Sequence, residues 1–117
     1  MNFLELVKRR YSCRAYLPRD VEREKIDYVL ECVRFAPSAV NRQPWQFRVV
    51  NSAEQRAKLQ QCYNRDWFNT APVYIIASIQ HDQEWVRADG KPHGNIDIAI
   101  AVDRDRKSGS AGMPRPI

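Results

Sequence analysis

The sequence predicts a mixed α/β (α+β) domain whose elements follow the order helix-helix-strand-helix-strand-helix. Two stretches rich in β-branched and apolar residues, 46–50 and 73–79, predict the strands. Apolar residues that recur at three- and four-residue steps behind capping residues predict the helices. The 117 residues, 44% hydrophobic and 28% charged, are sufficient for one globular domain with its own core.

The first two helices are predicted from capping residues and apolar spacing. Asn2 and Glu5 have the spacing of a capping box, so a helix is expected over residues 3–10. A proline-containing stretch without a helical period follows and predicts an extended connection. A second helix is expected to open at Asp20, with acids in its first turn, and to close at Pro37.

The rest of the chain alternates strand-like and helix-like segments. The apolar run over 73–79 is typical of a central strand that is covered on both faces. Two interpretations are open for Asp97, in the last predicted helix: a functional role, and local capping or pairing, which is the favoured one. In order, the expected elements are a loop over 38–44, a strand over 46–50, a helix over 52–63 opened by Ser52 with Gln55, a strand over 73–79, a polar connection over 80–93, and a helix capped by Asn95 that begins with 96–102.

The apolar pattern changes after Val102. Residues 103–117 alternate charges, continue through glycine and serine, and end in Pro-Arg-Pro-Ile. Such a composition predicts an aperiodic tail that is disordered or read out of frame. An apolar helix that is interrupted after two turns is an unusual end for a domain, because it must be buried against something.

The formal charge of +5 restricts the classes of partner. One basic cluster, residues 8–10 with Arg14 close behind, suits a small phosphate better than a nucleic-acid duplex. The longest apolar runs are far shorter than the roughly 20 residues that span a bilayer, so no membrane partner is expected. The start of the chain lacks the features of a secretory signal, which predicts a cytoplasmic protein.

Cysteine and histidine spacing predicts neither a disulfide framework nor a metal site. The three cysteines have no C-x-x-C spacing. His81 and His93 lie in polar loop sequence and lack matching ligands. We therefore expect reduced thiols and no metal.

The loop after the second helix carries polar side chains at fixed intervals. Ser38, Asn41 and Gln43 offer one hydroxyl and two amides, which can hydrogen-bond a neutral heterocycle. A structural interpretation is also open, in which Ser38 and Asn41 cap turns while Pro44 and Trp45 pack the entrance to the strand. Composition alone favours the structural interpretation.

A second polar stretch follows the first helix. In Arg10-Tyr11-Ser12-Cys13-Arg14 two arginines, four residues apart, flank a serine hydroxyl. Guanidinium groups bind phosphate oxygens in a bidentate way, and the hydroxyl can complete the cradle. A solvated basic helix end is the alternative.

Together the two stretches resemble the nitroreductase family, in which an Arg-x-Ser-x-Arg element and a later Pro-Ser-x-x-Asn-x-Gln-Pro-Trp loop contact FMN. The matching segments here are residues 10–14 and 37–45, in the same order and spacing. The resemblance extends through Ala71-Pro72 to the helix that begins near Asn95, and so covers about residues 1–102. It implies that residues 1–102 are the N-terminal part of a nitroreductase-like domain and that the chain stops before this fold is complete.

The resemblance implies a three-layer sandwich of the nitroreductase type that forms a homodimer with FMN at the subunit interface. Arg10, Ser12 and Arg14 are then expected to hold the phosphate and ribityl chain. The loop is expected near the flavin ring, in many members across the subunit boundary. The implied cofactor-binding residues are Arg10, Tyr11, Ser12, Arg14, Pro37, Ser38, Asn41 and Gln43.

The implied reaction is hydride transfer from NADH or NADPH to the flavin, followed by reduction of nitroaromatics, quinones or similar small acceptors in a ping-pong sequence. No catalytic side chain is expected, because the flavin carries the electrons. Two alternatives stay open: an inactive fragment or flavin-binding remnant of such an enzyme, and a small basic nucleic-acid-binding module.

Overall fold

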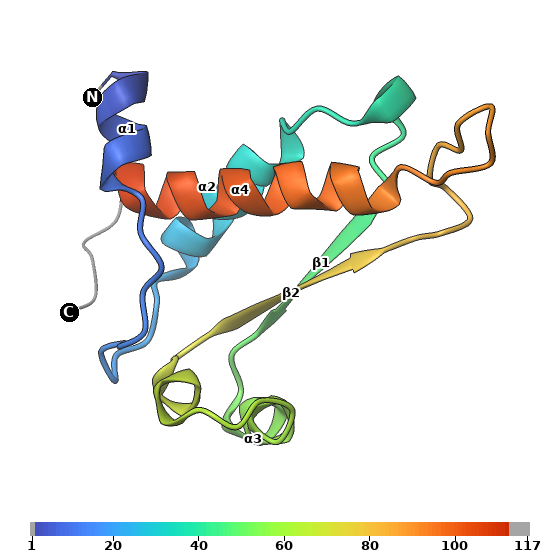
Figure 1. Cartoon of the computed structure of the whole chain (residues 1–117). Helices are drawn as coiled ribbons and strands as arrows, with labels where there is room; N and C mark the ends of the chain where they lie inside the picture. The colour runs from blue at the N-terminus through green and yellow to red at the C-terminus, as the bar shows by residue number, and fades with distance from the viewer. Residues whose placement is uncertain (1, 113–117) are drawn as a thin grey trace.

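The computed structural model describes residues 2–112, and their side chains as far as Lys107. Its element order confirms the predicted helix-helix-strand-helix-strand-helix arrangement (Figure 1). The elements are α1 (Phe3–Arg9), α2 (Arg23–Arg34), β1 (Trp45–Val50), α3 (Ala53–Gln60), β2 (Tyr74–Ile79) and α4 (Gly94–Gly112), with short 3-10 turns η1 (Ala39–Asn41) and η2 (Asp66–Thr70).

Side-chain caps start two of the helices where the sequence predicts them. At α1 the Glu5 amide donates to Asn2 Oδ1 at 2.9 Å, and the Asn2 amide donates to Glu5 Oε2 at 3.1 Å, which completes the capping box. At α3 the Gln55 amide donates to Ser52 Oγ at 3.3 Å. Helix α2 starts at Arg23, later than expected, and no side chain caps its N-terminus.

Strands β1 and β2 form an antiparallel pair with Trp45 opposite Ile79 and Val50 opposite Tyr74. Within residues 2–112 the sheet consists of these two strands. Exposure alternates along β2, and Ile76 is 37% exposed. The expectation of a central strand covered on both faces is therefore wrong for the described part of the chain, because β2 pairs along one edge only.

The core contains two small apolar clusters, one near each end of the strand pair. Helix α4 packs against α1, α2 and both strands. Ala101 of α4 is 0% exposed and packs in the same cluster as Val33 of α2. One cluster contains Val33, Ala36 and Ala101 with Trp45, Phe47 and Ile100, and the other contains Val50, Ala71 and Tyr74 with Tyr16, Leu59 and Phe68.

Helix α4 continues beyond Val102, where the sequence predicted an aperiodic tail. Residues 103–112 are helical, so that expectation is wrong for this segment. The buried positions Asp97 and Ala101 are followed at the same four-residue step by the partly buried Asp105. On the exposed side, Lys107 Nζ lies 2.7 Å from Asp103 Oδ2. The remainder of the predicted tail, 113–117, lies outside the described residues.

The N-terminus of α4 is held by an acid from the preceding connection. The Gly94 amide donates to Glu84 Oε2 at 3.1 Å, where a carboxylate also complements the helix dipole. Asn95 is the second residue of the helix, so its expected role as the cap is wrong. None of the helices within residues 2–112 has the length and apolar character needed to cross a bilayer.

Substitution of Gly94 by alanine should destabilise the fold. A Cβ at this buried position would overlap Glu84 Oε2 and lie 2.8 Å from Ile79 Cγ2. We expect Gly94→Ala to lower the free energy of unfolding by about 1–3 kcal/mol, as for other overpacked sites. Urea denaturation measures this loss. Asn95→Ala, at the exposed neighbouring position, is the control and should change the value by less than about 0.5 kcal/mol. Equal effects of both substitutions would contradict the overlap.

Candidate functional site

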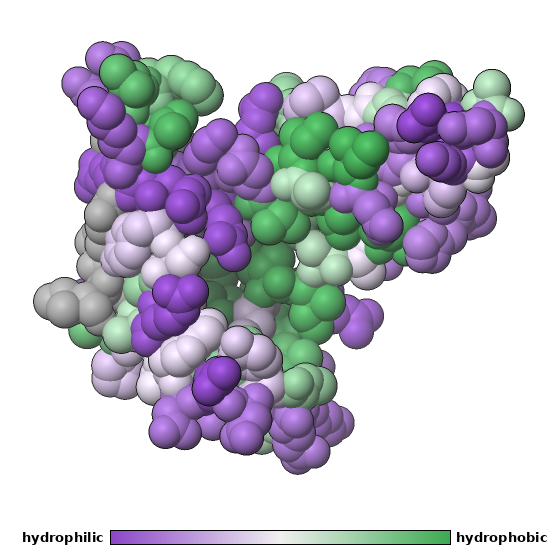
Figure 2. All heavy atoms as spheres, in the orientation of Figure 1, coloured by the Kyte–Doolittle hydropathy of each residue, from purple (hydrophilic) through white to green (hydrophobic). Residues whose placement is uncertain are grey.

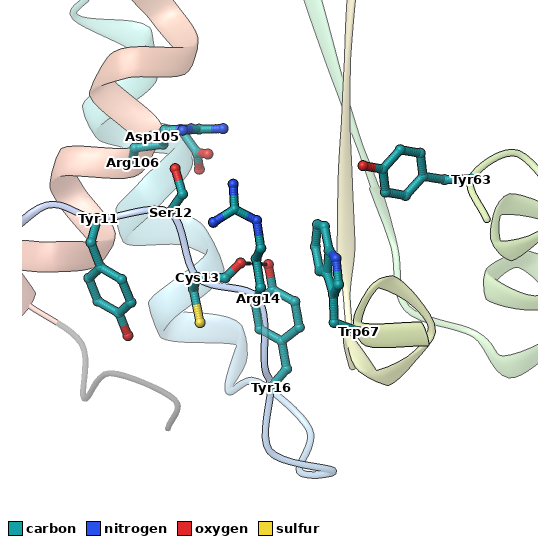
Figure 3. A pocket seen from close by; sticks show the side chains of 9 residues that line it. All are labelled: Tyr11, Ser12, Cys13, Arg14, Tyr16, Tyr63, Trp67, Asp105 and Arg106. Carbon is teal, nitrogen blue, oxygen red and sulfur yellow. Dashed lines mark hydrogen bonds between the residues drawn. The ribbon is translucent and has the colours of Figure 1, made fainter. Parts of the chain in front are cut away.

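A cavity of about 470 Å³ lies between the segment after α1, the η2 turn and the second half of α4 (Figure 3). Its volume is in the range of small-molecule sites, about 300–1,000 Å³. Three of the predicted cofactor-binding residues line it: Tyr11, Ser12 and Arg14. The complete lining is Tyr11, Ser12, Cys13, Arg14, Tyr16, Tyr63, Trp67, Asp105 and Arg106.

One side of the cavity carries groups that can bind an anion. Figure 3 shows the Arg14 guanidinium directed into the space below Arg106, with the Ser12 hydroxyl beside it. Guanidinium groups donate paired hydrogen bonds to phosphate oxygens, and a serine hydroxyl donates one more. This side of the cavity can therefore hold a phosphate group.

The other side of the cavity is aromatic. The Trp67 ring centroid lies 6.3 Å from that of Tyr16 and 5.8 Å from that of Tyr63. The Tyr16 hydroxyl donates to the carbonyl oxygen of Cys13 at 3.0 Å. Burial raises the pKa of Tyr16, so its hydroxyl stays a neutral donor at physiological pH.

The sequence analysis missed this aromatic wall. Tyr63, Trp67 and Phe68 fall within six residues, in a segment that has no apolar period. Such a concentration of aromatic residues outside a regular element was the available signal. Without the fold, however, nothing places these rings beside Arg14.

Asp105 adds an acid to the cavity. Desolvation raises the pKa of its carboxyl group above the ordinary value of 3.8, and the nearby Arg106 charge partly opposes this rise. A higher pKa means that the charged form is less favourable in the folded chain.

The loop over residues 38–43 has an unusual backbone. Val40, Asn41 and Gln43 have φ angles of 55°, 53° and 50°, in the left-handed region. For the β-branched Val40 this conformation is a genuine outlier. Such strain persists only where the surrounding structure holds it, and it is concentrated at functional sites.

Hydrogen bonds within the loop agree with the turn-capping interpretation for Ser38. Its Oγ accepts from the Gln43 amide at 3.0 Å, and its carbonyl oxygen accepts from the Asn41 amide at 3.0 Å. Pro44 is fully buried at the entrance to β1. The Ser38 hydroxyl can still donate its own hydrogen to a ligand.

Asp97 joins this loop to α4. Its Oδ1 accepts from the Ala39 amide at 3.0 Å, across 58 positions of sequence, and the residue is 2% exposed. The expectation that Asp97 pairs locally is therefore wrong. Its Oδ2 is buried and has no hydrogen-bond partner among the described residues.

The two predicted cofactor-binding stretches lie at opposite ends of α4 (Figure 1). Asp97, which holds the loop, and Asp105, which lines the cavity, are separated by about 12 Å along the helix axis, at 1.5 Å per residue. Arg10 is the C-terminal cap of α1 and does not line the cavity. Pro37, Ser38, Asn41 and Gln43 belong to the loop at the far end.

No group of three or more His, Cys, Asp or Glu side chains in the described part of the chain is placed to hold a metal ion.

The pKa shift of Asp105 predicts a pH dependence of stability. A raised pKa means that, above pH 3.8, the folded chain binds more protons at this carboxyl group than the unfolded chain does. The free energy of unfolding should therefore fall as the pH rises above 3.8. We expect Asp105→Asn to remove this fall and to raise the melting temperature at pH 7, measured by thermal unfolding between pH 4 and 7.

The matched control is Asp103→Asn, an exposed acid on the same helix that pairs with Lys107. It should cost no more than about 0.5 kcal/mol and should leave the pH dependence unchanged. If the melting temperatures of Asp105→Asn and the unchanged chain have the same pH dependence, folding does not raise the pKa of Asp105.

Comparison with known proteins gives consistent results. The sequence model of the Nitroreductase family matches residues 7–62. A protein of Methanothermobacter thermautotrophicus, provisionally named an NADH dehydrogenase/NAD(P)H nitroreductase, is 39% identical over 105 residues, which cover 85% of this chain and 55% of the relative. A Bacillus subtilis protein named an FMN reductase acting with NAD(P)H is 30% identical over 66 residues, which cover 55% of this chain and 26% of the relative.

A solved structure shows the same fold. The crystal structure of a nitroreductase family protein from Clostridium difficile 630 superposes with a TM-score of 0.87 at 40% identity, covering 94% of this chain and 63% of that one. The chain thus spans about half to two thirds of the length of these similar proteins, apart from the shorter match to the Bacillus subtilis protein.

Proposed function

Because the chain belongs to the nitroreductase family and covers part of its domain, we propose that it is part of an FMN-dependent oxidoreductase. The proposed enzyme uses NADH or NADPH to reduce small acceptors such as nitroaromatics or quinones. The observation that carries this proposal is the cavity that combines Ser12 and Arg14 with an aromatic wall.

The cavity residues fit the chemistry of FMN. Arg14 and Ser12 would hold its phosphate, with Arg106 contributing a second guanidinium from α4. Trp67 and Tyr63 present aromatic surface on the opposite side (Figure 3). When bound, FMN supplies the hydride and electron chemistry, so the chain needs no nucleophile or general acid of its own.

The loop over 38–43 has the proposed role of orienting the flavin ring. Its amide groups and the Ser38 hydroxyl can donate to ring oxygen and nitrogen atoms. Because loop and cavity lie at opposite ends of α4, we propose that one FMN is held by the cavity of one subunit and the loop of another. Arg10 remains a predicted contact by its place in the Arg-x-Ser-x-Arg element.

A homodimer is part of this proposal. Phe3, Leu4 and Val7 of α1 are exposed. Figure 2 shows hydrophobic surface at the upper left, where α1 lies in Figure 1. The radius of gyration, 15.6 Å, exceeds the roughly 13 Å expected for a compact chain of this length. An open shape with exposed apolar side chains favours association with a second copy.

Reconstitution with FMN tests the proposal directly. The purified chain, incubated with FMN and passed through a desalting column, should retain flavin absorbance. It should then oxidise NADH or NADPH in the presence of a nitroaromatic or a quinone, with parallel lines in double-reciprocal plots as expected for a ping-pong sequence. Retained FMN without turnover would support the alternative of a flavin-binding remnant. Failure to retain FMN would overturn the assignment of the cavity.

Arg14→Ala should weaken FMN binding. Loss of a charged hydrogen bond to phosphate costs on the order of 1.5–3 kcal/mol, which corresponds to about 10- to 150-fold in Kd. Arg10→Ala should have a smaller effect, because Arg10 lies outside the cavity lining. Quenching of FMN fluorescence on titration with protein measures the Kd of each variant for FMN.

Arg19→Ala, an exposed arginine beyond the cavity, is the matched control and should leave Kd unchanged. If Arg14→Ala binds FMN as tightly as Arg19→Ala does, Arg14 does not hold the FMN phosphate in this cavity.

A further inference from the structure

We infer that Asp97 is a positioning residue that holds the proposed flavin-contacting loop, residues 38–43, in its binding conformation. The inference rests on the proposed function. It assigns a role in flavin binding to a residue that lies outside both cofactor-binding motifs and acts through the loop backbone.

The first observation is the contact itself. Asp97 Oδ1 accepts the Ala39 amide at 3.0 Å, and the carboxylate is almost completely buried. Asp97 lies in the first turn of α4, where the helix dipole favours a negative charge. A charge-assisted hydrogen bond in such a site is stronger than a neutral one.

The second observation is the strain that this contact holds in place. Ala39 directly precedes Val40, the first of three residues with positive φ. A β-branched residue strongly disfavours this conformation, so a loop without an anchor would relax to another one. Val40 is 67% exposed, so burial of its own side chain does not explain the conformation.

The other hydrogen bonds of the loop do not fix its place relative to α4. The bond from the Gln43 amide to Ser38 Oγ joins two residues of the loop to each other, and the same holds for two backbone bonds, Asn41 amide to Ser38 carbonyl and Arg42 amide to Ala39 carbonyl. The bond from the Gln80 amide to the Pro44 carbonyl, at 2.7 Å, fixes the start of β1 rather than the strained residues. The bond from Ala39 to Asp97 therefore sets where the loop lies relative to α4.

The unpaired oxygen of Asp97 supports a role beyond stability. Its Oδ2 is buried without a hydrogen-bond partner among the described residues, which is costly for a carboxylate. An apolar residue would avoid this cost but would release the Ala39 amide. An acid at this position is therefore explained by the hydrogen bond that positions the loop.

The experiment compares Asp97→Ala, which removes the acceptor, with Asp97→Asn, which keeps an acceptor oxygen at the same place. Kd for FMN is measured by fluorescence quenching, and the visible absorption spectrum of bound FMN reports the surroundings of the ring. Asp97→Ala should raise Kd at least tenfold and shift the spectrum, whereas Asp97→Asn should stay within about threefold of the unchanged chain. Asp103→Ala, an exposed acid on the same helix, should change neither.

Relief of the backbone strain at Val40 distinguishes a role of Asp97 in positioning the loop from a purely structural role. Glycine adopts positive φ without cost, so Val40→Gly should recover a large part of the FMN affinity lost in Asp97→Ala. Tryptic cleavage after the exposed Arg42, measured relative to cleavage after Arg48 in β1, should rise in Asp97→Ala and not in Asp97→Asn.

The outcomes separate the inference from the proposed function. If the unchanged chain binds FMN and Asp97→Ala binds it equally well with the same spectrum, the inference is overturned and the proposed function stands. A lower melting temperature in Asp97→Ala without a change in Kd also overturns it. If the unchanged chain binds no FMN, the proposed function fails and the flavin role of Asp97 fails with it.

Discussion

Packing of α4 against the rest of the chain is the constraint on which the described structure depends. This helix contacts α1, α2 and both strands, and its completely buried Ala101 packs in one apolar cluster with Val33 of α2. Asp97 and Asp105 lie one turn to either side of Ala101 and meet the loop and the cavity. One buried stripe of a single helix therefore supports the core and both candidate binding regions.

That stripe explains why the end of α4 could not be predicted from the sequence. Charged residues are expected on the solvated face of a helix, so Asp103, Asp105 and Arg106 predict an interruption of the apolar helix. In the structure the buried stripe itself contains acids, while Ile96 is largely exposed. The helix starts of α1 and α3 could be predicted, because each depends on a cap from a residue within the same turn.

The candidate site likewise contains residues that the sequence could select and residues that only the fold brings there. Motif spacing selected Ser12 and Arg14, which both line the cavity, but also Arg10 of the same motif, which does not line it. Trp67 reaches them only through the packing of η2 against the segment after α1, and Asp97 reaches Ala39 across 58 positions. Contacts of this kind arise from tertiary structure and leave no local pattern in the sequence.

The rigid α4 segment between Asp97 and Asp105 also determines where the chain can change in length during evolution. Insertion of one residue there would rotate one end of the helix by about 100° relative to the other, and would carry either the loop anchor or the cavity wall off its partner. The exposed turn over 87–91, within the connection that precedes α4, has no such coupling. Related sequences should therefore vary in length in this turn and keep an unchanged number of residues between Asp97 and Asp105.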